Sequence, residues 1–310
     1  MRFSSTTLAS SLIIGAAAFA AACAHNGTTA SAHDHDSMAM PTSGASATSA
    51  MAAMASDSSL VPGATNAAAR LNQSPRHGEW VTIRAGAQAG DSLRLWVVYP
   101  QRSTKAPVVV VVHEIFGLST WIRSVADQLA SDGFIAIAPD FLTGKIPLSA
   151  TDTVGMQAAM AAIRTLDPEV VQRQIDAAAA YGMALPAAKE RYGVIGFCWG
   201  GGVSFQHAVH SPTLGASVVY YGTSPATPSL ASVRAPVLGL YGGEDARVDA
   251  TIPPADSAMR AMGKQYTHQV FAGAGHGFLR AQDGMNGANL AAARGAWPMT
   301  INFLRTNLER

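Results

Sequence analysis

The sequence predicts an α/β fold in which helices cover both faces of a mostly parallel sheet of about eight strands. From about Pro75 onward, strand-like stretches alternate with stretches of helical periodicity. One stretch, residues 108–112, is an uninterrupted run of valine, which is typical of a strand that helices bury on both faces. The roughly 235 residues of this part are enough for one domain with a sizeable core. The alternation therefore favours parallel strands joined by helical crossovers.

Each element follows from its composition and from the residues that bound it. Predicted strands are apolar or alternating runs that end at Gly, Pro or Asp. We expect strands over residues 80–84, 93–99, 108–112, 134–138, 192–196, 216–221, 236–241 and 266–271. We expect helices over residues 121–130, 156–166, 170–183, 199–210, 252–262 and 288–307. Ligands of such sheets collect beyond the carboxyl ends of the strands, so residues that follow a strand are the first candidates for function.

The pattern of residues 1–23 predicts that this segment is an export signal peptide. Arg2 is the only charge before Cys23, and the uncharged run 8–22 ends in three alanines. That run is too short to span a bilayer comfortably, and small residues close it as at a cleavage site. Cys23 at this junction resembles the lipobox of bacterial lipoproteins, although Ala20 stands where leucine is usual. We expect a periplasmic protein or one tethered to the membrane by a lipid on Cys23, with ordinary cleavage and secretion as the alternative.

Residues 24–75 predict a low-complexity, flexible tether. Between residues 24 and 59 there is no aromatic residue, no Leu, Ile or Val, and no Lys or Arg. Such a segment cannot bury enough apolar surface to offset its chain entropy. Its His and Met residues suit a soft metal ion but have no defined ligand geometry, so a spacer is favoured. These residues are His25, His33, His35, Met38 and Met40.

The composition excludes several classes of function. Lys and Arg total 21 and Asp and Glu total 20, so the net charge is +1. A nucleic-acid partner is not expected, because it requires a clustered positive surface. The two cysteines, Cys23 and Cys198, exclude a disulfide scaffold and a multi-cysteine zinc site. We expect no metal and no cofactor, and membrane contact only through an N-terminal lipid.

A candidate nucleophile follows the predicted strand 192–196. Residues 196–200 read Gly-Phe-Cys-Trp-Gly, the pattern of a nucleophile elbow with Cys198 in place of serine. Glycine is needed two positions before and after the nucleophile because side chains there would collide in the strained turn. The N-terminus of the next helix favours a thiolate and an oxyanion. The alternative is a buried structural cysteine, the usual state of a free cysteine.

An acid and a histidine follow two later strands. Asp245 comes shortly after strand 236–241, and His276 lies in a Gly-rich loop after strand 266–271. The order nucleophile, acid, histidine is that of the α/β-hydrolase fold. His276 would take the thiol proton, and Asp245 would fix the tautomer and orientation of the ring. Glu244 is the rival of Asp245, and a plain surface position is the alternative for His276.

The loop after strand 108–112 offers an oxyanion site. Residues 113–117 read His-Glu-Ile-Phe-Gly. In an α/β-hydrolase, the loop at this position donates one backbone N–H to the oxyanion, and the residue after the nucleophile donates a second. The predicted donors are the backbone N–H groups of Ile115 and Trp199. Glu114 would lie at the mouth of a dry site, where a carboxylate is unfavourable without a partner. A solvated loop carboxylate is the alternative for Glu114.

Four motifs together resemble the dienelactone hydrolase family, and the likeness runs from about residue 80 to the C-terminus. They are His-Glu-Ile-Phe-Gly at 113–117, Gly-Phe-Cys-Trp-Gly-Gly at 196–201, Asp245, and Gly-His-Gly-Phe at 275–278. The resemblance implies an α/β-hydrolase that opens the enol-lactone ring of dienelactone to give maleylacetate, without a cofactor. It implies that Cys198 is the nucleophile, His276 the acid and base, and Asp245 the residue that orients the ring.

The same resemblance implies roles for Glu114 and Arg280. Glu114 matches a glutamate that holds the resting thiol and helps to form the thiolate when substrate enters. Arg280 matches an arginine that binds the substrate carboxylate through paired hydrogen bonds, and a solvated cation at a helix start is the alternative. Where the family has a second arginine this chain has Lys145, one place displaced, which is only a point charge. We therefore expect a small-molecule ester or lactone as substrate without assigning dienelactone itself.

The favoured hypothesis is an exported hydrolase that cleaves an ester or lactone through the Cys198 thiolate and a thioester. The first alternative is a general carboxylesterase on the same triad, which needs no carboxylate on its substrate. The second alternative is a catalytically silent lipoprotein that binds a ligand or holds a metal ion.

Overall fold

The computed structural model describes residues 59–86, 91–147 and 155–310. The predicted export signal, the lipobox at Cys23 and the His/Met-rich segment lie outside these residues. Within the described ranges, no helix is both long enough and apolar enough to cross a membrane.

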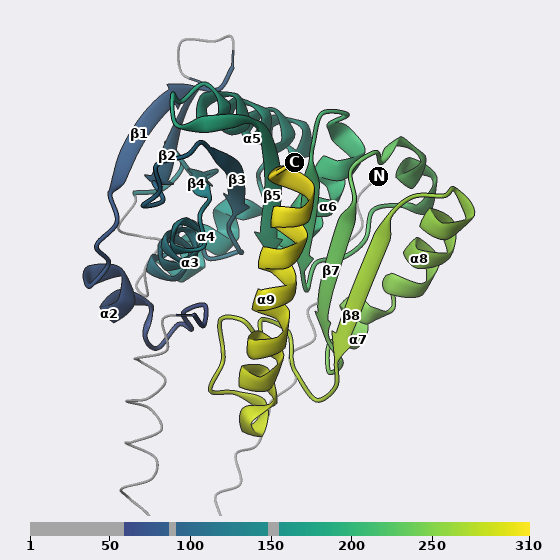
Figure 1. The fold of residues 1–310 in the computed structure, drawn as a ribbon. Coiled ribbons are helices and arrows are strands. Elements are labelled where there is room, and N and C mark those ends of the chain that lie inside the picture. Colours follow the sequence, from purple (N-terminus) through teal and green to yellow (C-terminus); the bar gives the residue numbers. More distant parts are fainter. Residues whose placement is uncertain (1–58, 87–90, 148–154) are drawn as a thin grey trace, which may run out of the picture. The chain divides into compact units, whose positions relative to one another are not determined.

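The described domain is built on an eight-stranded sheet with the order β1-β2-β4-β3-β5-β6-β7-β8 (Figure 1). Its strands are β1 Gly78–Arg84, β2 Ser92–Val98, β3 Ala106–Val112, β4 Ile135–Asp140, β5 Ala188–Phe197, β6 Ala216–Tyr220, β7 Val237–Gly242 and β8 Tyr266–Phe271. The pairs β1/β2 and β2/β4 are antiparallel, and all other neighbouring strands are parallel. The predicted sheet of about eight mostly parallel strands is confirmed.

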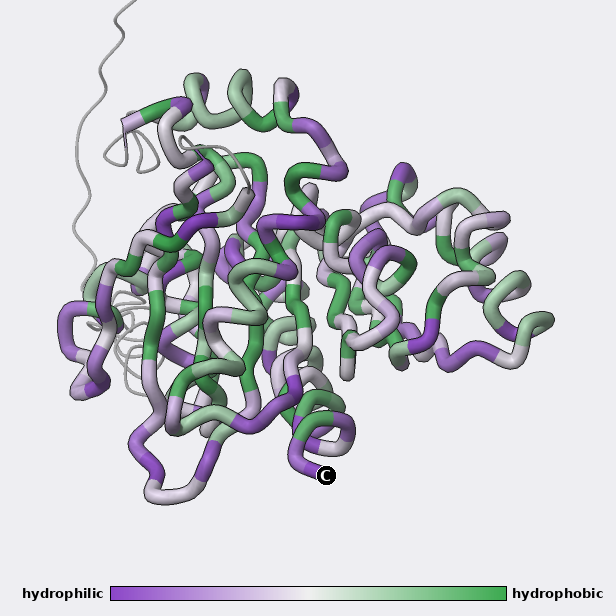
Figure 2. The backbone as a smooth tube through the Cα atoms, turned by 90° about the horizontal axis from the view of Figure 1, so that it is seen from above, coloured by the Kyte–Doolittle hydropathy of each residue, from purple (hydrophilic) through white to green (hydrophobic). Residues whose placement is uncertain are grey.

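Helices cover both faces of this sheet (Figures 1 and 2). They are α2 Ala67–Asn72, α3 Thr120–Ser131, α4 Met156–Ile163, α5 Pro168–Met183, α6 Trp199–His210, α7 Ala246–Asp249, α8 Ile252–Ala261 and α9 Ala288–Leu308, with short 3₁₀ helices at Thr227–Ser232 and Met285–Gly287. The sequence did not predict α2, α7 or the 3₁₀ helices. These elements have only one or two turns, too few for a helical period to be recognised.

The valines of β3 show how the core divides between the two faces. All seven residues of β3 are buried. Val109 and Val111 pack in one cluster with residues of α3 and α9, whereas Val108, Val110 and Val112 pack in another with residues of α5, α6 and α8. Because successive side chains of a strand point to opposite faces, α3 and α9 cover one face and α5, α6 and α8 the other. The valine run therefore lies at the centre of the sheet, as predicted.

The segment predicted as a flexible tether is folded at its C-terminal end. Leu60 and Val61 are buried, and α2 packs against α3. The indole N–H of Trp121 donates a hydrogen bond to the carbonyl oxygen of Pro62 at 2.9 Å. The tether prediction is therefore wrong for residues 59–75. The apolar pair Leu60 and Val61, which the preceding residues lack, supplies the buried surface that offsets the entropy of ordering this segment.

Candidate active site

Cys198 is the single residue between β5 and α6. Its φ of 57° and ψ of −116° are strained for a residue that carries a side chain. A Cβ atom on Gly196 would collide with the carbonyl oxygen of Gly200, and a Cβ atom on Gly200 would collide with that of His113. The elbow therefore requires glycine on both sides of Cys198 because backbone approaches backbone there, as the spacing predicted.

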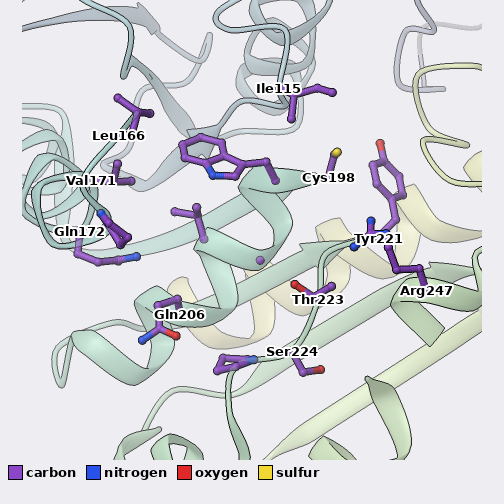
Figure 3. A pocket seen from close by; sticks show the side chains of 15 residues that line it. Ile115, Leu166, Val171, Gln172, Cys198, Gln206, Tyr221, Thr223, Ser224 and Arg247 are labelled. Carbon is purple, nitrogen blue, oxygen red and sulfur yellow. The ribbon is translucent and has the colours of Figure 1, made fainter. Parts of the chain in front are cut away.

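Cys198 is half-buried and lines a pocket of about 520 Å³ (Figure 3). The lining also includes Ile115 after β3, Trp199 after β5, Tyr221 after β6 and Arg247 after β7. The carboxyl ends of four parallel strands thus meet at one pocket, which is the expected position for a ligand site in such a sheet. Its volume suits a small organic molecule.

Asp245 and His276 form a close pair at the same edge of the sheet. Nδ1 of His276 lies 2.5 Å from Oδ2 of the buried Asp245, so Nδ1–H donates to the carboxylate and Nε2 is left to exchange a proton with a thiol. The pKa of His276 is raised to about 9, mainly by a hydrogen-bonding contact with Cys198. Burial of the ring opposes this rise, and the hydrogen bond to Asp245 adds to it. Glu244, the rival acid, is exposed, and among the described residues the hydrogen bond and ion pair of the His276 ring are with Asp245 and not with Glu244. The structure therefore brings the predicted nucleophile, histidine and acid together.

Glu114 is buried, with its side chain only 4% exposed, and is not the solvated loop carboxylate of the alternative. Its Oε1 lies 2.9 Å from Nε of Arg280, in an ion pair that is not aligned as a hydrogen bond. Burial raises the pKa of Glu114 to about 7, and the charges of Arg280 and His276 partly offset the rise. The guanidinium of Arg280 also lies over the ring of Phe116, 4.9 Å from its centroid. Arg280 is therefore engaged by Glu114 and Phe116.

The two predicted oxyanion donors, Ile115 and Trp199, both line the pocket with Cys198. Trp199 is the first residue of α6, so its backbone N–H has no acceptor within the helix. The ring of Trp199 stacks on His113, which precedes Glu114 in the loop after β3, with ring centroids 5.5 Å apart. The two loops are thus in contact, and the role of the N–H groups stays a prediction.

The cation that lines the pocket is Arg247, and the predicted Lys145 is not among the lining residues. Lys145 is exposed in a turn after β4, where its backbone N–H donates to Leu142 at 2.9 Å. Arg247 lies in α7, two residues after Asp245, and forms no ion pair with any residue the structure describes. The only signal for Arg247 in the sequence is its closeness to Asp245, and proximity along the chain does not give the direction of a side chain.

Tyr221 and Gln172 are two further pocket residues that the sequence did not indicate. The ring of Tyr221 makes an edge contact with His276, with centroids 5.2 Å apart. Burial is the main cause that raises the pKa of the Tyr221 hydroxyl well above its usual value, so this group stays protonated. Gln172 comes from α5 and reaches the pocket only because α5 packs beside α6.

The sheet order, the elbow and the acid–histidine pair define an α/β-hydrolase. Solved structures share this fold. A structure titled "Putative Dienelactone Hydrolase" from Klebsiella pneumoniae is 25% identical, with a TM-score of 0.62, and the match covers 73% of this chain and 98% of that one. Dienelactone hydrolase from Anabaena variabilis is 22% identical, with a TM-score of 0.57 over 75% of this chain and 99% of the other, and shows the fold alone.

Sequence comparison gives the family within that class. A profile described as "Dienelactone hydrolase family" matches residues 93–308. A protein of Salmonella typhimurium named "Putative carboxymethylenebutenolidase" is 31% identical over 260 aligned positions, and the match covers 79% of this chain and 94% of the relative. One of the same name from Saccharolobus solfataricus is 30% identical over 70% of this chain and 95% of its own length. The chain belongs to the dienelactone hydrolase family and is a hydrolase, as the four motifs predicted.

Proposed function

We propose that this protein hydrolyses a small carboxylic ester or lactone through a thioester on Cys198. One observation carries the proposal: the 2.5 Å pair of Asp245 and His276 meets Cys198 at the elbow, and Cys198 lines a pocket of about 520 Å³. A buried structural cysteine would need neither a strained backbone nor a raised histidine pKa beside it.

The proposed reaction has two halves. The Cys198 thiolate attacks the carbonyl carbon of the substrate, and the resulting oxyanion accepts hydrogen bonds from the N–H groups of Ile115 and Trp199. The carbon–oxygen bond then breaks, the leaving alkoxide takes a proton from His276, and the acyl group remains on sulfur. Water next attacks the thioester while His276 takes its proton, and the carboxylic acid leaves as the thiol or thiolate is restored. A lactone follows the same steps, with both products in one molecule.

Glu114 and Arg280 suit control of the thiol. With a pKa of about 7, Glu114 is able to hold or release a proton near neutral pH. Its partner Arg280 binds carboxylates well. A substrate carboxylate that pairs with Arg280 leaves Glu114 free to take the thiol proton, so thiolate forms mainly when substrate is bound.

A general carboxylesterase is the second candidate. The observation that favours it is the ion pair of Arg280 with Glu114, which withholds the guanidinium from a substrate carboxylate. The relatives supply the narrower expectation, because their names refer to carboxymethylenebutenolidases and to a lactonase. The family match supports hydrolysis over a catalytically silent binding protein.

We also propose that residues 1–23 direct export and that Cys23 carries a lipid, as their composition predicts. Fractionation of cells that produce the full chain tests this part. Protein in the membrane fraction that becomes water-soluble after Cys23→Ser supports lipidation, and protein that stays in the cytoplasm contradicts export.

A hydrolysis screen of dienelactone, aryl esters and simple lactones, with Cys198→Ala as the paired variant, tests the function. Cys198→Ala is expected to abolish turnover, and mass spectrometry of the wild-type protein is expected to show an acyl group on Cys198 during turnover. Equal activity of the two proteins would refute the mechanism.

A further inference from the structure

The pocket extends away from the reacting sulfur to a second end. Figure 3 shows Leu166, Val171 and Gln172 at the end of the pocket opposite Cys198 and Tyr221. We call Leu166, Val171 and Gln172 the distal subsite. Two of its members are apolar, and Gln172 is its polar member. A substrate that fills the pocket must therefore place some group against this amide.

Gln172 is held by a buried histidine. Its Oε1 accepts a hydrogen bond from Nδ1 of His207, on α6, at 2.8 Å. Gln172 is 3% exposed and His207 is fully buried. The amide Nε2 of Gln172 makes no hydrogen bond to any other side chain or backbone group of the described residues. Because Gln172 lines the pocket, this nitrogen is the donor that the distal subsite offers.

The partners of His207 fix the direction of this hydrogen bond. Nε2 of His207 lies 3.0 Å from the hydroxyl of Tyr192, and that hydroxyl lies 2.8 Å from Oγ of Ser211. Since Nδ1 donates to Gln172, Nε2 must accept from Tyr192, and Tyr192 must accept from Ser211. The result is a chain of hydrogen bonds in one direction, which polarises each member and keeps the NH₂ group of Gln172 turned away from His207.

The imidazole of His207 stays neutral, so the chain does not reverse as the pH falls. Burial is the main cause that lowers the pKa of His207 to about 3, and the neighbouring His210 adds to it. Asp176 lies 3.7 Å from Nε2 of His207 but is paired with His210 at 2.9 Å. A neutral His207 therefore makes no ion pair with Asp176.

We propose that Gln172 is a specificity-determining residue that donates a hydrogen bond to a neutral acceptor oxygen on the substrate, and that His207 is the positioning residue that aims it. The acceptor is a ketone, ester or ether oxygen, separated from the scissile carbonyl by an apolar stretch that fits Leu166 and Val171. This inference rests on the proposed function, because it names the substrate class of the same pocket.

A carboxylate is a poorer match for this end of the pocket. Gln172 carries no charge, and Asp176 follows it by one helical turn on α5. Asp176 does not line the pocket, but its negative charge disfavours a second carboxylate about one helical turn away. Arg247, the cation of the lining, lies instead near Tyr221 in Figure 3. The distal subsite is therefore expected to prefer a ketone to a carboxylate of the same shape.

Matched esters test this preference. We would compare three p-nitrophenyl esters of equal chain length whose acyl chains end in a methyl ketone, an isopropyl group or a carboxylate, over several chain lengths. A second series carries the same end groups on the alcohol side, since the pocket does not fix which half of the substrate points to Gln172. In one series the wild-type protein is expected to favour the ketone over the isopropyl ester by about 3- to 10-fold in kcat/KM, the effect of one hydrogen bond.

The variants separate positioning from folding. Gln172→Met is expected to reduce the ketone-to-isopropyl ratio to about one, with the loss in KM for the ketone ester rather than in kcat. His207→Phe is expected to lower the ratio in the same way, and the double variant is expected to lose no more than Gln172→Met alone. His268→Phe, at a half-buried histidine on β8 that pairs with Asp256 rather than with Gln172 or His207, is the matched control and retains the ratio. If His207→Phe does not fold, Tyr192→Phe, which removes the hydroxyl that Nε2 accepts from, is expected to weaken the ratio.

Binding distinguishes a failure here from a failure of the proposed function. The non-hydrolysable amides with the same end groups are titrated into Cys198→Ala protein by calorimetry. Ketone amides that bind more tightly than isopropyl amides, and lose this advantage in Cys198→Ala/Gln172→Met, support the subsite even if no ester is hydrolysed. A wild-type ratio near one in both series, or an undiminished ratio after Gln172→Met, would overturn it.

Discussion

Arg280, in the loop after β8, lies 2.9 Å from Glu114, in the loop after β3. The residue expected to bind the substrate carboxylate is thus held by the residue expected to activate the thiol. In the proposed mechanism this ion pair connects substrate binding with thiolate formation, because an anionic group that approaches Arg280 must compete with Glu114. The role of Arg280 in binding a substrate carboxylate is therefore tested by replacing this side chain.

Arg280→Ala is expected to lower kcat/KM for carboxylate-bearing esters, relative to neutral esters, by about 10- to 100-fold, the effect of one charge-assisted hydrogen bond. Arg280→Lys keeps the positive charge but cannot form the paired hydrogen bonds of a guanidinium, and its kcat/KM for carboxylate-bearing esters is expected to fall less than that of Arg280→Ala. The measurement is the ratio of kcat/KM for a carboxylate ester and its neutral analogue in each protein. A ratio that Arg280→Ala leaves unchanged would favour the general carboxylesterase.

Asp245→Asn is expected to reduce kcat by about 10²- to 10⁴-fold, because an amide that donates to Nδ1 favours the wrong tautomer of His276. Glu244→Gln is the matched control, since Glu244 is adjacent in sequence but exposed. It should change kcat by no more than about twofold. Steady-state kinetics on one activated ester check both variants, and a large loss in Glu244→Gln instead would exchange the roles of the two acids.

Glu114 is expected to make the stability of the protein depend on pH. Its pKa rises from 4.5 in the unfolded chain to about 7 in the folded protein, so between these values the folded state binds more protons. Its contribution is therefore most favourable below about pH 4.5 and is lost as the pH rises through about 7. The loss is on the order of 3 kcal/mol for a group this deeply buried.

Urea unfolding of the wild type and of Glu114→Gln, at about pH 5 and about pH 8, tests this dependence. Glu114→Gln is expected to gain stability relative to the wild type as the pH rises, because the amide does not ionise. Glu244→Gln serves as the exposed control and should show no such gain. A difference between wild type and Glu114→Gln that is the same at both pH values would contradict the raised pKa.

The folded boundary of the domain predicts the effect of truncation. A chain that begins at residue 76 lacks Leu60, Val61 and α2, and is expected to be less stable than one that begins at residue 59 by about 3 kcal/mol or more. The loss includes the hydrogen bond from Trp121 to Pro62. Urea titration of the two chains measures the difference, and equal midpoints would show that residues 59–75 add nothing to the core.

Several features of the active site can be read from the sequence alone because they leave a pattern along the chain. The crowding at Gly196 is local, because a Cβ atom there would meet the backbone of Gly200, whereas Gly200 is crowded by the distant backbone of Val112 and His113; the glycine spacing around Cys198 identifies the elbow in both cases. The valine run of β3 identifies a central strand because a strand buried on both faces has no polar side to show. The chain order of Cys198, Asp245 and His276 then identifies the class of fold.

Other features depend on contacts between residues far apart in the chain. Nothing near Glu114 in the sequence predicts its ion pair with Arg280. Arg247, and not Lys145, lines the pocket because α7 begins shortly after the carboxyl end of β7, next to the pocket. Leu60 and Val61 look like the end of a spacer until α3 provides a surface to pack on.

The sequence by itself determined the sheet, the elbow and the family, because periodicity, glycine spacing and motif order are patterns along the chain that do not require the packed structure. The tertiary structure alone decided which side chains share the pocket. The chain from Tyr192 through His207 to Gln172 joins β5, α6 and α5, and its geometry exists only once these elements pack against one another. Side-chain direction and burial are properties of the packed molecule. They determine the pKa values of Glu114 and His276, and the specificity proposed for Gln172 depends on them as well.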